Sequence, residues 1–296
     1  MTIFHCQAKS ISRATRRSAT AAAAYRSGER IIDERTGEIH DYRKKQGVTD
    51  KQVFVPRGCR GIVRSALWNL AEKAENRKDA KVAREWEVAL PAELKVHERR
   101  DVAREFALAI VKRYGVAVDM CIHAPGKQGD DRNHHVHILT TTRILTPDGL
   151  GEKTRVLDSP RTSGKEVTAV REMWAQICNF ALARNGLDEH IDSRSLKAQG
   201  IDRDPTRHLG PIASAMERRG VSSLRGDENR RRRESRTERE LAALRKVENG
   251  MEAARSRHAS RKNWKAAKVE RQRQGRDSCF LGDVGGQKRN DKDRGR

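Results

Sequence analysis

The alternation of apolar and polar residues identifies two half-buried strands in the first two thirds of the chain. One runs from Arg84 to Leu90, where three apolar residues alternate with two glutamates: Trp86, Val88 and Leu90 against Glu85 and Glu87. The other runs from Val116 to His123, where the pattern is Val118, Met120 and Ile122 against Asp119, Cys121 and His123. Because successive strand side chains point to opposite faces, each strand has one face for a core and one for polar groups.

Two further strands are expected at residues 3–8 and 135–143, and segments with helical character lie between the strands. Four helices are expected, at residues 18–27, 62–83, 96–114 and 167–183. The first contains the run Ala21–Ala24, and alanine is the best helix former. Gly115 and the pair Asn185-Gly186 supply the ends of the last two helices. Strands, hairpins and interposed helices together predict an α+β fold whose helices pack on one face of a sheet.

The net charge of the chain indicates what kind of molecule it binds. The 296 residues include 63 Lys and Arg against 41 Asp and Glu, a formal net charge of +22, so a polyanion is the expected partner. No apolar run reaches the length of a membrane-spanning helix, and the N-terminus does not resemble a signal peptide. The five cysteines are scattered without a CxxC pair, so their spacing indicates neither a disulfide framework nor a thiolate zinc site. A cytoplasmic protein without membrane insertion is therefore expected.

The last part of the chain differs from the rest. Residues 216–296 hold 25 Lys and Arg against 13 Asp and Glu, and they contain a run of four arginines, Arg230, Arg231, Arg232 and Arg233. Few apolar residues are available for a core, so a basic tail that is partly helical or disordered is expected beyond a boundary near residue 215. The arginine run could clamp duplex DNA, serve as a docking or secretion signal, or simply be a solvated charged segment.

Three histidines form the most informative cluster. If residues 116–123 and 135–143 form a hairpin, His123 lies near His135, and His137 shares a strand face with His135. Imidazoles are common ligands of divalent metals, and three protein ligands leave positions open for a substrate. The alternative is a polar loop that happens to be rich in histidine; the hairpin placement of His123 favours the metal site.

Tyr25 ends the alanine-rich helix, close to Arg16, Arg17 and Arg26. Tyrosine can act as a covalent nucleophile, and the arginines could hold phosphates. From residue type alone, a tyrosine packed on the sheet is the commoner interpretation. Glu85 and Glu87 could orient a metal ligand or accept a proton, but a solvated strand face explains them as readily.

Four stretches together resemble the MobA/MobL (MobQ-type) family of plasmid relaxases, which belong to the HUH endonucleases. They are SATAAAAYRSGERIIDERTGEIHDY, LWNLAEKAENRKDAKVAREWEVALPAEL, NHHVHILTTTR and RSLKAQGIDRDPTRHLG. The resemblance covers about residues 1–215 and implies a central antiparallel sheet with helices behind it. It also implies that Tyr25 is the nucleophile and that His123, His135 and His137 hold a divalent metal, Mg or Mn. A glutamate of REWEVALP matches the family's acidic residue; Glu87 is preferred, although Glu85 shares its face.

The implied activity is site- and strand-specific nicking of a plasmid transfer origin through a 5′-phosphotyrosyl intermediate, followed by rejoining. The implied partners are single-stranded and duplex DNA, accessory mobilisation proteins and a type IV coupling protein, with export of the protein attached to its DNA. Tyr25 precedes the histidines and no tyrosine follows Tyr114, which excludes the arrangement of replication initiators. The alternatives are a non-enzymatic DNA-binding accessory protein, a metal-dependent nuclease that uses water, and an RNA-binding protein, although few aromatic residues are available to stack bases.

Overall fold

The computed structural model describes residues 4–126, 130–202 and 204–279. The chain divides into two compact units, Met1–Ser195 and Leu196–Arg296. The boundary expected near residue 215 therefore lies inside the second unit, within the helix Gly210–Arg218 (α5).

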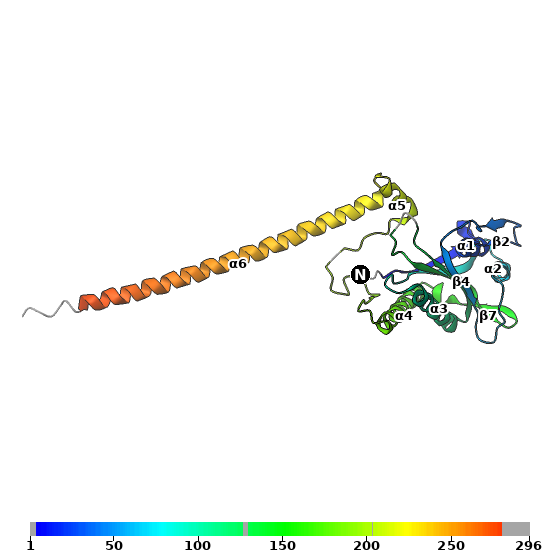
Figure 1. Cartoon of the computed structure of the whole chain (residues 1–296), viewed down its shortest axis with the longest axis horizontal. Helices are drawn as coiled ribbons and strands as arrows, with labels where there is room; N and C mark the ends of the chain where they lie inside the picture. Colours follow the sequence, from blue (N-terminus) through cyan, green and yellow to red (C-terminus); the bar gives the residue numbers. More distant parts are fainter. Residues whose placement is uncertain (1–3, 127–129, 203, 280–296) are drawn as a thin grey trace, which may run out of the picture. The chain divides into compact units, whose positions relative to one another are not determined.

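The first unit is built on a six-stranded antiparallel sheet (Figure 1). Its strands are β1 (Cys6–Ser12), β4 (Val48–Phe54), β5 (Lys81–Ala89), β6 (Val116–His123), β7 (His135–Thr146) and β8 (Gly149–Lys153). The order across the sheet is β1-β5-β7-β6-β4, and β8 pairs with β7. A separate hairpin joins β2 (Arg30–Ile32) to β3 (Ile39–Asp41). The predicted α+β class with a central antiparallel sheet is confirmed.

Local sequence signals explain where the helices begin and end. Ser18 caps α1 (Ala19–Ser27) by accepting a hydrogen bond from the backbone N–H of Ala21, and Gly28 ends it in the left-handed conformation, at φ 63°. The helix α3 (Val96–Tyr114) ends in the same way at Gly115, at φ 65°. These two helices, and α4 (Ser163–Arg184), lie close to their predicted positions.

One face of the sheet is apolar and is covered by α3 and α4. The core there combines inward residues of the central strands with residues of the two helices: Trp86, Val88, Val118, Met120, Ile122, Val136 and Ile138 with Val102, Phe106, Ile110, Val170, Trp174 and Cys178. Phe106 and Trp174 contact each other with ring centroids 4.9 Å apart. This is the core that strand alternation predicts.

The opposite face is also covered, which differs from the expectation of helices on one face. Here α1 and α2 (Arg64–Lys73) pack over a second cluster, formed by Ile11, Ala19, Ala22, Ala23, Leu67, Trp68, Ala71, Ala83, Ala117 and Leu139. The alanine side chains of α1 are small, so this helix can lie close to the strands. Polar strand residues that would otherwise face solvent, including Glu85 and Asp119, are consequently buried.

The second predicted helix, at residues 62–83, is wrong over nearly half of its length, residues 74–83. The helix α2 ends at Lys73, and residues 81–83 belong to β5, where Ile11 pairs with Ala83 and Ser12 with Lys81. The apolar residues Ala80 and Val82 continue the helical pattern but also fit a strand. Pairing with β1 therefore overrides local propensity.

The second unit contains α5 and the 56-residue helix α6 (Leu224–Cys279). Within it, Arg230 forms ion pairs with Glu217 and Asp227, and Arg232 donates to the backbone oxygen of Pro205. Arg231 and Arg233 are exposed. None of the helices in the described residues combines the length and apolar character needed to cross a membrane.

Candidate active site

Three histidines meet at one end of the β6–β7 hairpin. The register pairs His123 with His135 and Cys121 with His137. The ring centroids lie 5.3 Å apart for His123 and His135, 4.6 Å for His123 and His137, and 5.1 Å for His135 and His137. One ligand nitrogen from each ring lies within 4.8 Å of the others. The hairpin inferred from the sequence thus brings together the three rings expected to hold a metal.

Each imidazole donates one hydrogen bond, from one of its ring nitrogens, to an oxygen of the protein. His123 Nε2–H donates to the Arg26 backbone oxygen at 2.7 Å, His135 Nδ1–H to the Asn133 oxygen at 3.0 Å, and His137 Nδ1–H to Glu85 at 2.7 Å. These acceptors fix the tautomer of each ring, because a carbonyl or carboxylate oxygen requires an N–H opposite it. The other nitrogen of each ring is thereby left as a lone-pair donor, the arrangement found around metal-ligating histidines.

Burial favours the neutral form of two of these rings. It lowers the pKa of His123 to about 3 and also lowers the pKa of His135. Metal ligation needs neutral imidazole, so these two rings need not lose a proton at neutral pH. Three nitrogen donors suit a divalent transition metal. Mg and Mn prefer oxygen ligands, which water and a phosphate could supply at the remaining positions.

Glu85 lies beneath α1 and joins the histidines to this helix. Its side chain is fully buried and accepts hydrogen bonds from His137 Nδ1 and from Arg26 Nε and Nη2. Burial alone would raise the pKa of Glu85, but these hydrogen bonds hold it well below its ordinary value. The carboxylate is therefore charged and fixed in place.

Glu87, which the sequence favoured over Glu85, is placed differently. Its carboxylate is 26% exposed and pairs with Lys9, and one oxygen lies 3.9 Å from His137 Nδ1. The sequence alone could not separate the two glutamates because both share one strand face. Their depth separates them: Glu85 contacts His137 directly, and Glu87 lies at the rim.

Tyr25 is half exposed on α1 rather than packed on the sheet. Its ring makes an edge-to-face contact with Tyr42, with centroids 5.2 Å apart. The next residue, Arg26, fixes this helix end to the histidines in two ways, through its backbone oxygen on His123 and its guanidinium on Glu85. The helix end that carries Tyr25 is therefore held at the histidine cluster, and Tyr25 itself is half exposed.

The three arginines proposed as phosphate ligands have different environments. Arg26 is buried, and all of its donor nitrogens are used, since Nη1 donates to the Ala22 oxygen at 2.9 Å. Its expected role as a direct DNA contact is not supported by this geometry. Arg16 and Arg17 line a cavity of about 1140 Å³ bounded by α1, α2 and the β2–β3 turn, and Tyr25 also lines it.

Two side chains that contact the Tyr25 helix were missed in the sequence. Lys45, in the loop before β4, lies with its Nζ 3.7 Å from the centroid of the Tyr25 ring. Glu72 on α2 accepts from the first backbone N–H of α1, that of Ala19, at 2.6 Å and is paired with Arg13. Both residues come from segments far from Tyr25 in sequence, so no local pattern could identify them.

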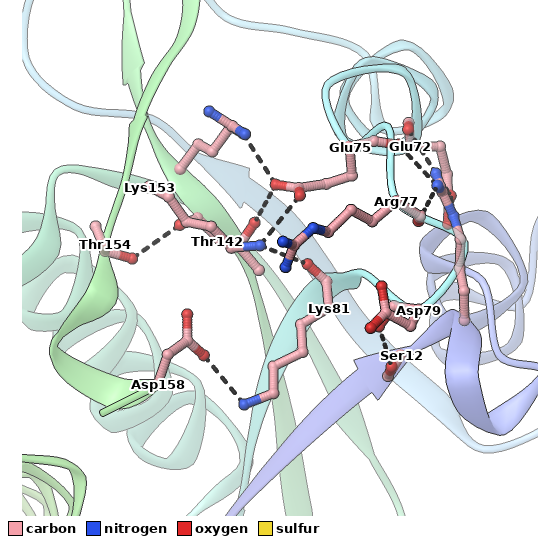
Figure 2. A network of polar contacts seen from close by, with 12 residues as sticks. Ser12, Glu72, Glu75, Arg77, Asp79, Lys81, Thr142, Lys153, Thr154 and Asp158 are labelled. Carbon is pink, nitrogen blue, oxygen red and sulfur yellow. Dashed lines mark hydrogen bonds and ion pairs between the residues drawn. The ribbon is translucent and has the colours of Figure 1, made fainter. Parts of the chain in front are cut away.

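A polar network near the start of β5 helps to hold this scaffold (Figure 2). Glu75 pairs with Lys153 at 3.1 Å and with Arg143 at 2.9 Å, and Lys81 pairs with Asp158 at 3.2 Å. In the register of β5 and β7, Glu87 lies opposite His137, and Lys81 is six residues before Glu87. The network therefore lies roughly 20 Å along the strand from the histidines. It joins the strand ends to the segment after α2.

Residues 17–219 match the model of the MobA/MobL family. The chain belongs to the MobA/MobL family. It is 39% identical over 258 residues to the mobilization protein MobL of Acidithiobacillus ferridurans, across 78% of this chain and 67% of that protein. It is 34% identical over 252 residues to the probable conjugal transfer protein TraA of Sinorhizobium fredii, where it spans 75% of this chain but 22% of TraA.

A solved structure supports the same fold. A chain from work on the molecular basis of vancomycin resistance transfer in Staphylococcus aureus has a TM-score of 0.57 and 29% identity, covering 65% of this chain and 99% of that one. The MobA/MobL match spans Tyr25, both glutamates and all three histidines. The protein is accordingly a relaxase of this family, as the resemblance in sequence implied.

Proposed function

We propose that this MobA/MobL relaxase nicks one DNA strand at a plasmid transfer origin by metal-dependent transesterification and later rejoins it. Tyr25 is the nucleophile, and His123, His135 and His137 are the metal ligands. The observation that carries the proposal is the double contact of Arg26, which holds the Tyr25 end of α1 against both His123 and Glu85.

The metal, Mg or Mn, would bind the three imidazole nitrogens left free by Arg26, Asn133 and Glu85. When bound, it supplies positive charge beside the scissile phosphate and orients that phosphate. Glu85 acts through His137 by fixing its tautomer and ring direction, so it is a positioning residue. Glu87 is partly exposed and lies near His137, so its carboxylate could exchange protons with water at the edge of the site.

Tyr25 performs the bond exchange. Its phenolic oxygen forms a bond to phosphorus, and the bond from phosphorus to the 3′ oxygen of the preceding nucleotide breaks. The phenolic proton passes to solvent and the 3′ oxygen gains one. One phosphodiester replaces another, so the step is close to balanced and can run backwards to rejoin the strand.

The surroundings fit a DNA substrate and a transfer apparatus. Arg16 and Arg17 beside Tyr25, with Arg231 and Arg233 exposed on α6, provide cationic contacts for single-stranded and duplex DNA. Residues 1–215 form the relaxase domain in this proposal and residues 216–296 a basic tail. We place the protein in the bacterial cytoplasm, with accessory mobilisation proteins and a type IV coupling protein as partners and with export attached to its DNA.

The test is a cleavage assay with the full chain and a labelled single-stranded oligonucleotide from the transfer origin beside its gene, in Mn or Mg. We expect a protein-linked DNA band on a denaturing gel, with the DNA mapped to Tyr25 by mass spectrometry. The band should vanish in Tyr25→Phe and with chelator. Tyr114→Phe is the matched control, because this tyrosine bonds to Glu166 on the apolar side of the sheet, and it should keep the band.

Two outcomes would replace the proposal. Cleavage without a protein-linked band would indicate a nuclease that activates water at the same histidines. Binding at low salt without any cleavage, in both metals, would indicate a DNA-binding accessory protein.

A further inference from the structure

Lys45 is the one member of a basic loop segment that turns inward. Arg43 pairs with Asp41 and Lys44 is exposed, whereas Lys45 is half-buried and donates from Nζ to the Tyr25 backbone oxygen at 2.8 Å. The loop is fixed at both sides, because the Lys45 N–H donates to the Tyr42 oxygen and the Ala124 N–H donates to the Gly47 oxygen. Its position is therefore built into the fold.

Among the residues that the structure describes, no carboxylate forms an ion pair with the Lys45 ammonium. Its Nζ contacts the backbone oxygen of Tyr25 and the face of the Tyr25 ring, 3.7 Å from the ring centroid. Burial, and then the nearby charge of Arg26, lowers the pKa of Lys45 to about 8. A cation held away from water beside another cation is costly unless an anion joins it.

Lys45 also lies near the histidines. The Tyr25 oxygen that accepts from Lys45 is one residue from the Arg26 oxygen that accepts from His123. The loop that carries Lys45 is also bound to the residue after His123, because the Ala124 N–H donates to the Gly47 oxygen. Lys45 therefore contacts Tyr25 at the helix end that is bound to the histidine cluster. A phosphodiester that contacts both Tyr25 and the histidines would lie close to this ammonium.

We propose that Lys45 is a further catalytic residue, whose ammonium binds a non-bridging oxygen of the scissile phosphate from the Tyr25 side. The inference rests on the proposed transesterification and adds a positively charged group on the Tyr25 side of the phosphate. Lys45 stays protonated throughout. Tyr25 Oη forms its bond to phosphorus, the bond to the 3′ oxygen breaks, and the proton lost by the phenol is balanced by the proton gained by the 3′ oxygen. Lys45 neutralises charge on the phosphoryl oxygens and the attacking oxygen while these bonds exchange.

Kinetics under single-turnover conditions, with saturating oligonucleotide and Mn, test this role. We expect Lys45→Met to slow formation of the protein-linked band about 100-fold, the size found when one donor to a developing oxyanion is removed. Lys45→Arg keeps the cation and should recover most of the rate. Lys44→Met, which removes the neighbouring exposed charge, is the matched control and should match the wild type.

A second measurement needs neither metal nor activity. The full-chain Tyr25→Phe protein, which keeps the ring beneath Lys45, is acetylated competitively with and without oligonucleotide, and each lysine is followed by mass spectrometry. An oligonucleotide carrying the scissile phosphodiester should protect Lys45, and one that ends at the preceding 3′-hydroxyl should not. Lys44 reports non-specific protection in the same sample.

The outcomes are distinguishable from a failure of the proposed function. If the wild type forms no protein-linked band, the transesterification itself is wrong. If it does, and Lys45→Met reacts at the wild-type rate, or both oligonucleotides protect Lys45 equally, the assignment of Lys45 is overturned. Should Lys45→Met lose its fold, the acetylation result decides alone.

Discussion

The two faces of the central sheet use alternate residues of the same strands for different purposes. Toward α3 and α4, β6 presents Val118, Met120 and Ile122, all buried among apolar side chains. Toward α1 and α2, the same strand presents Asp119, Cys121 and His123, also buried. The first face gains stability from apolar burial, whereas the second encloses charged groups that must be paired to be tolerated.

The charged face meets this requirement with a chain of paired groups. Asp119 accepts from Arg64 Nε at 2.8 Å and from Trp68 Nε1 at 2.9 Å, which joins α2 to β6. Glu85 accepts from His137 and Arg26, which joins α1 to β7. Each buried carboxylate therefore fixes a covering helix to the sheet. Positioning of the active site and burial of charge are achieved by the same contacts.

The largest expected effect is a loss of stability on the apolar face without a matching loss of activity. Trp86→Ala empties a fully buried site on the apolar face and should cost about 3–5 kcal/mol of unfolding free energy, as large-to-small changes at buried aromatics do. Chemical denaturation followed by circular dichroism measures it. DNA-linked product per folded molecule should stay within a few-fold of wild type, and loss of that activity in fully folded protein would contradict the division of roles.

The next prediction concerns metal binding by the histidines on the charged face of the sheet. His135→Ala removes one imidazole from the cluster at the hairpin end, where the ring is near solvent. Metal affinity measured by calorimetry should fall by more than about 100-fold, because changing only an outer hydrogen-bond partner already costs 10–100-fold. The unfolding free energy without metal should change by less than about 1 kcal/mol, the range of substitutions away from a packed core. His134→Ala, one residue earlier, is the matched control and should leave metal affinity unchanged.

Strand alternation and helix periodicity located most of the apolar face in advance. They predicted α3, β5, β6 and the hairpin, since each has a regular local period, and the alanine run predicted α1. They also placed Tyr25, Glu85 and the three histidines on the correct elements. The end of α2 was wrong because residues 80–83 fit both periods, and pairing with β1 decides between them.

The charged face could not be foreseen to the same extent. Whether Glu85 or Glu87 contacts His137 depends on how closely α1 approaches the sheet, and the burial of Arg26 depends on the same distance. Lys45 reaches Tyr25 from a loop twenty residues away. These are tertiary contacts between groups without a shared period, so a sequence pattern carries no signal for them.

The smallest expected effect concerns the one ionised contact described between α3 and α4. Glu166 accepts from Arg113 Nε at 2.6 Å and from the Tyr114 hydroxyl at 2.7 Å, and the Arg113 contact holds the pKa of Glu166 below its ordinary 4.5. Because the folded-state pKa is the lower one, the contact stabilises the fold above about pH 4.5, and this contribution is lost as the pH falls through the folded-state pKa. Glu166→Gln should therefore reduce the unfolding free energy at pH 7 by about 1 kcal/mol or less, as partly exposed ion pairs do, and by progressively less below pH 4.5. Urea unfolding of both proteins at several pH values measures the difference. If the difference in unfolding free energy is the same at every pH, Glu166 stabilises the fold through packing and not through its charge. The contact between α3 and α4 would then stabilise the protein in the same way as the rest of the apolar face.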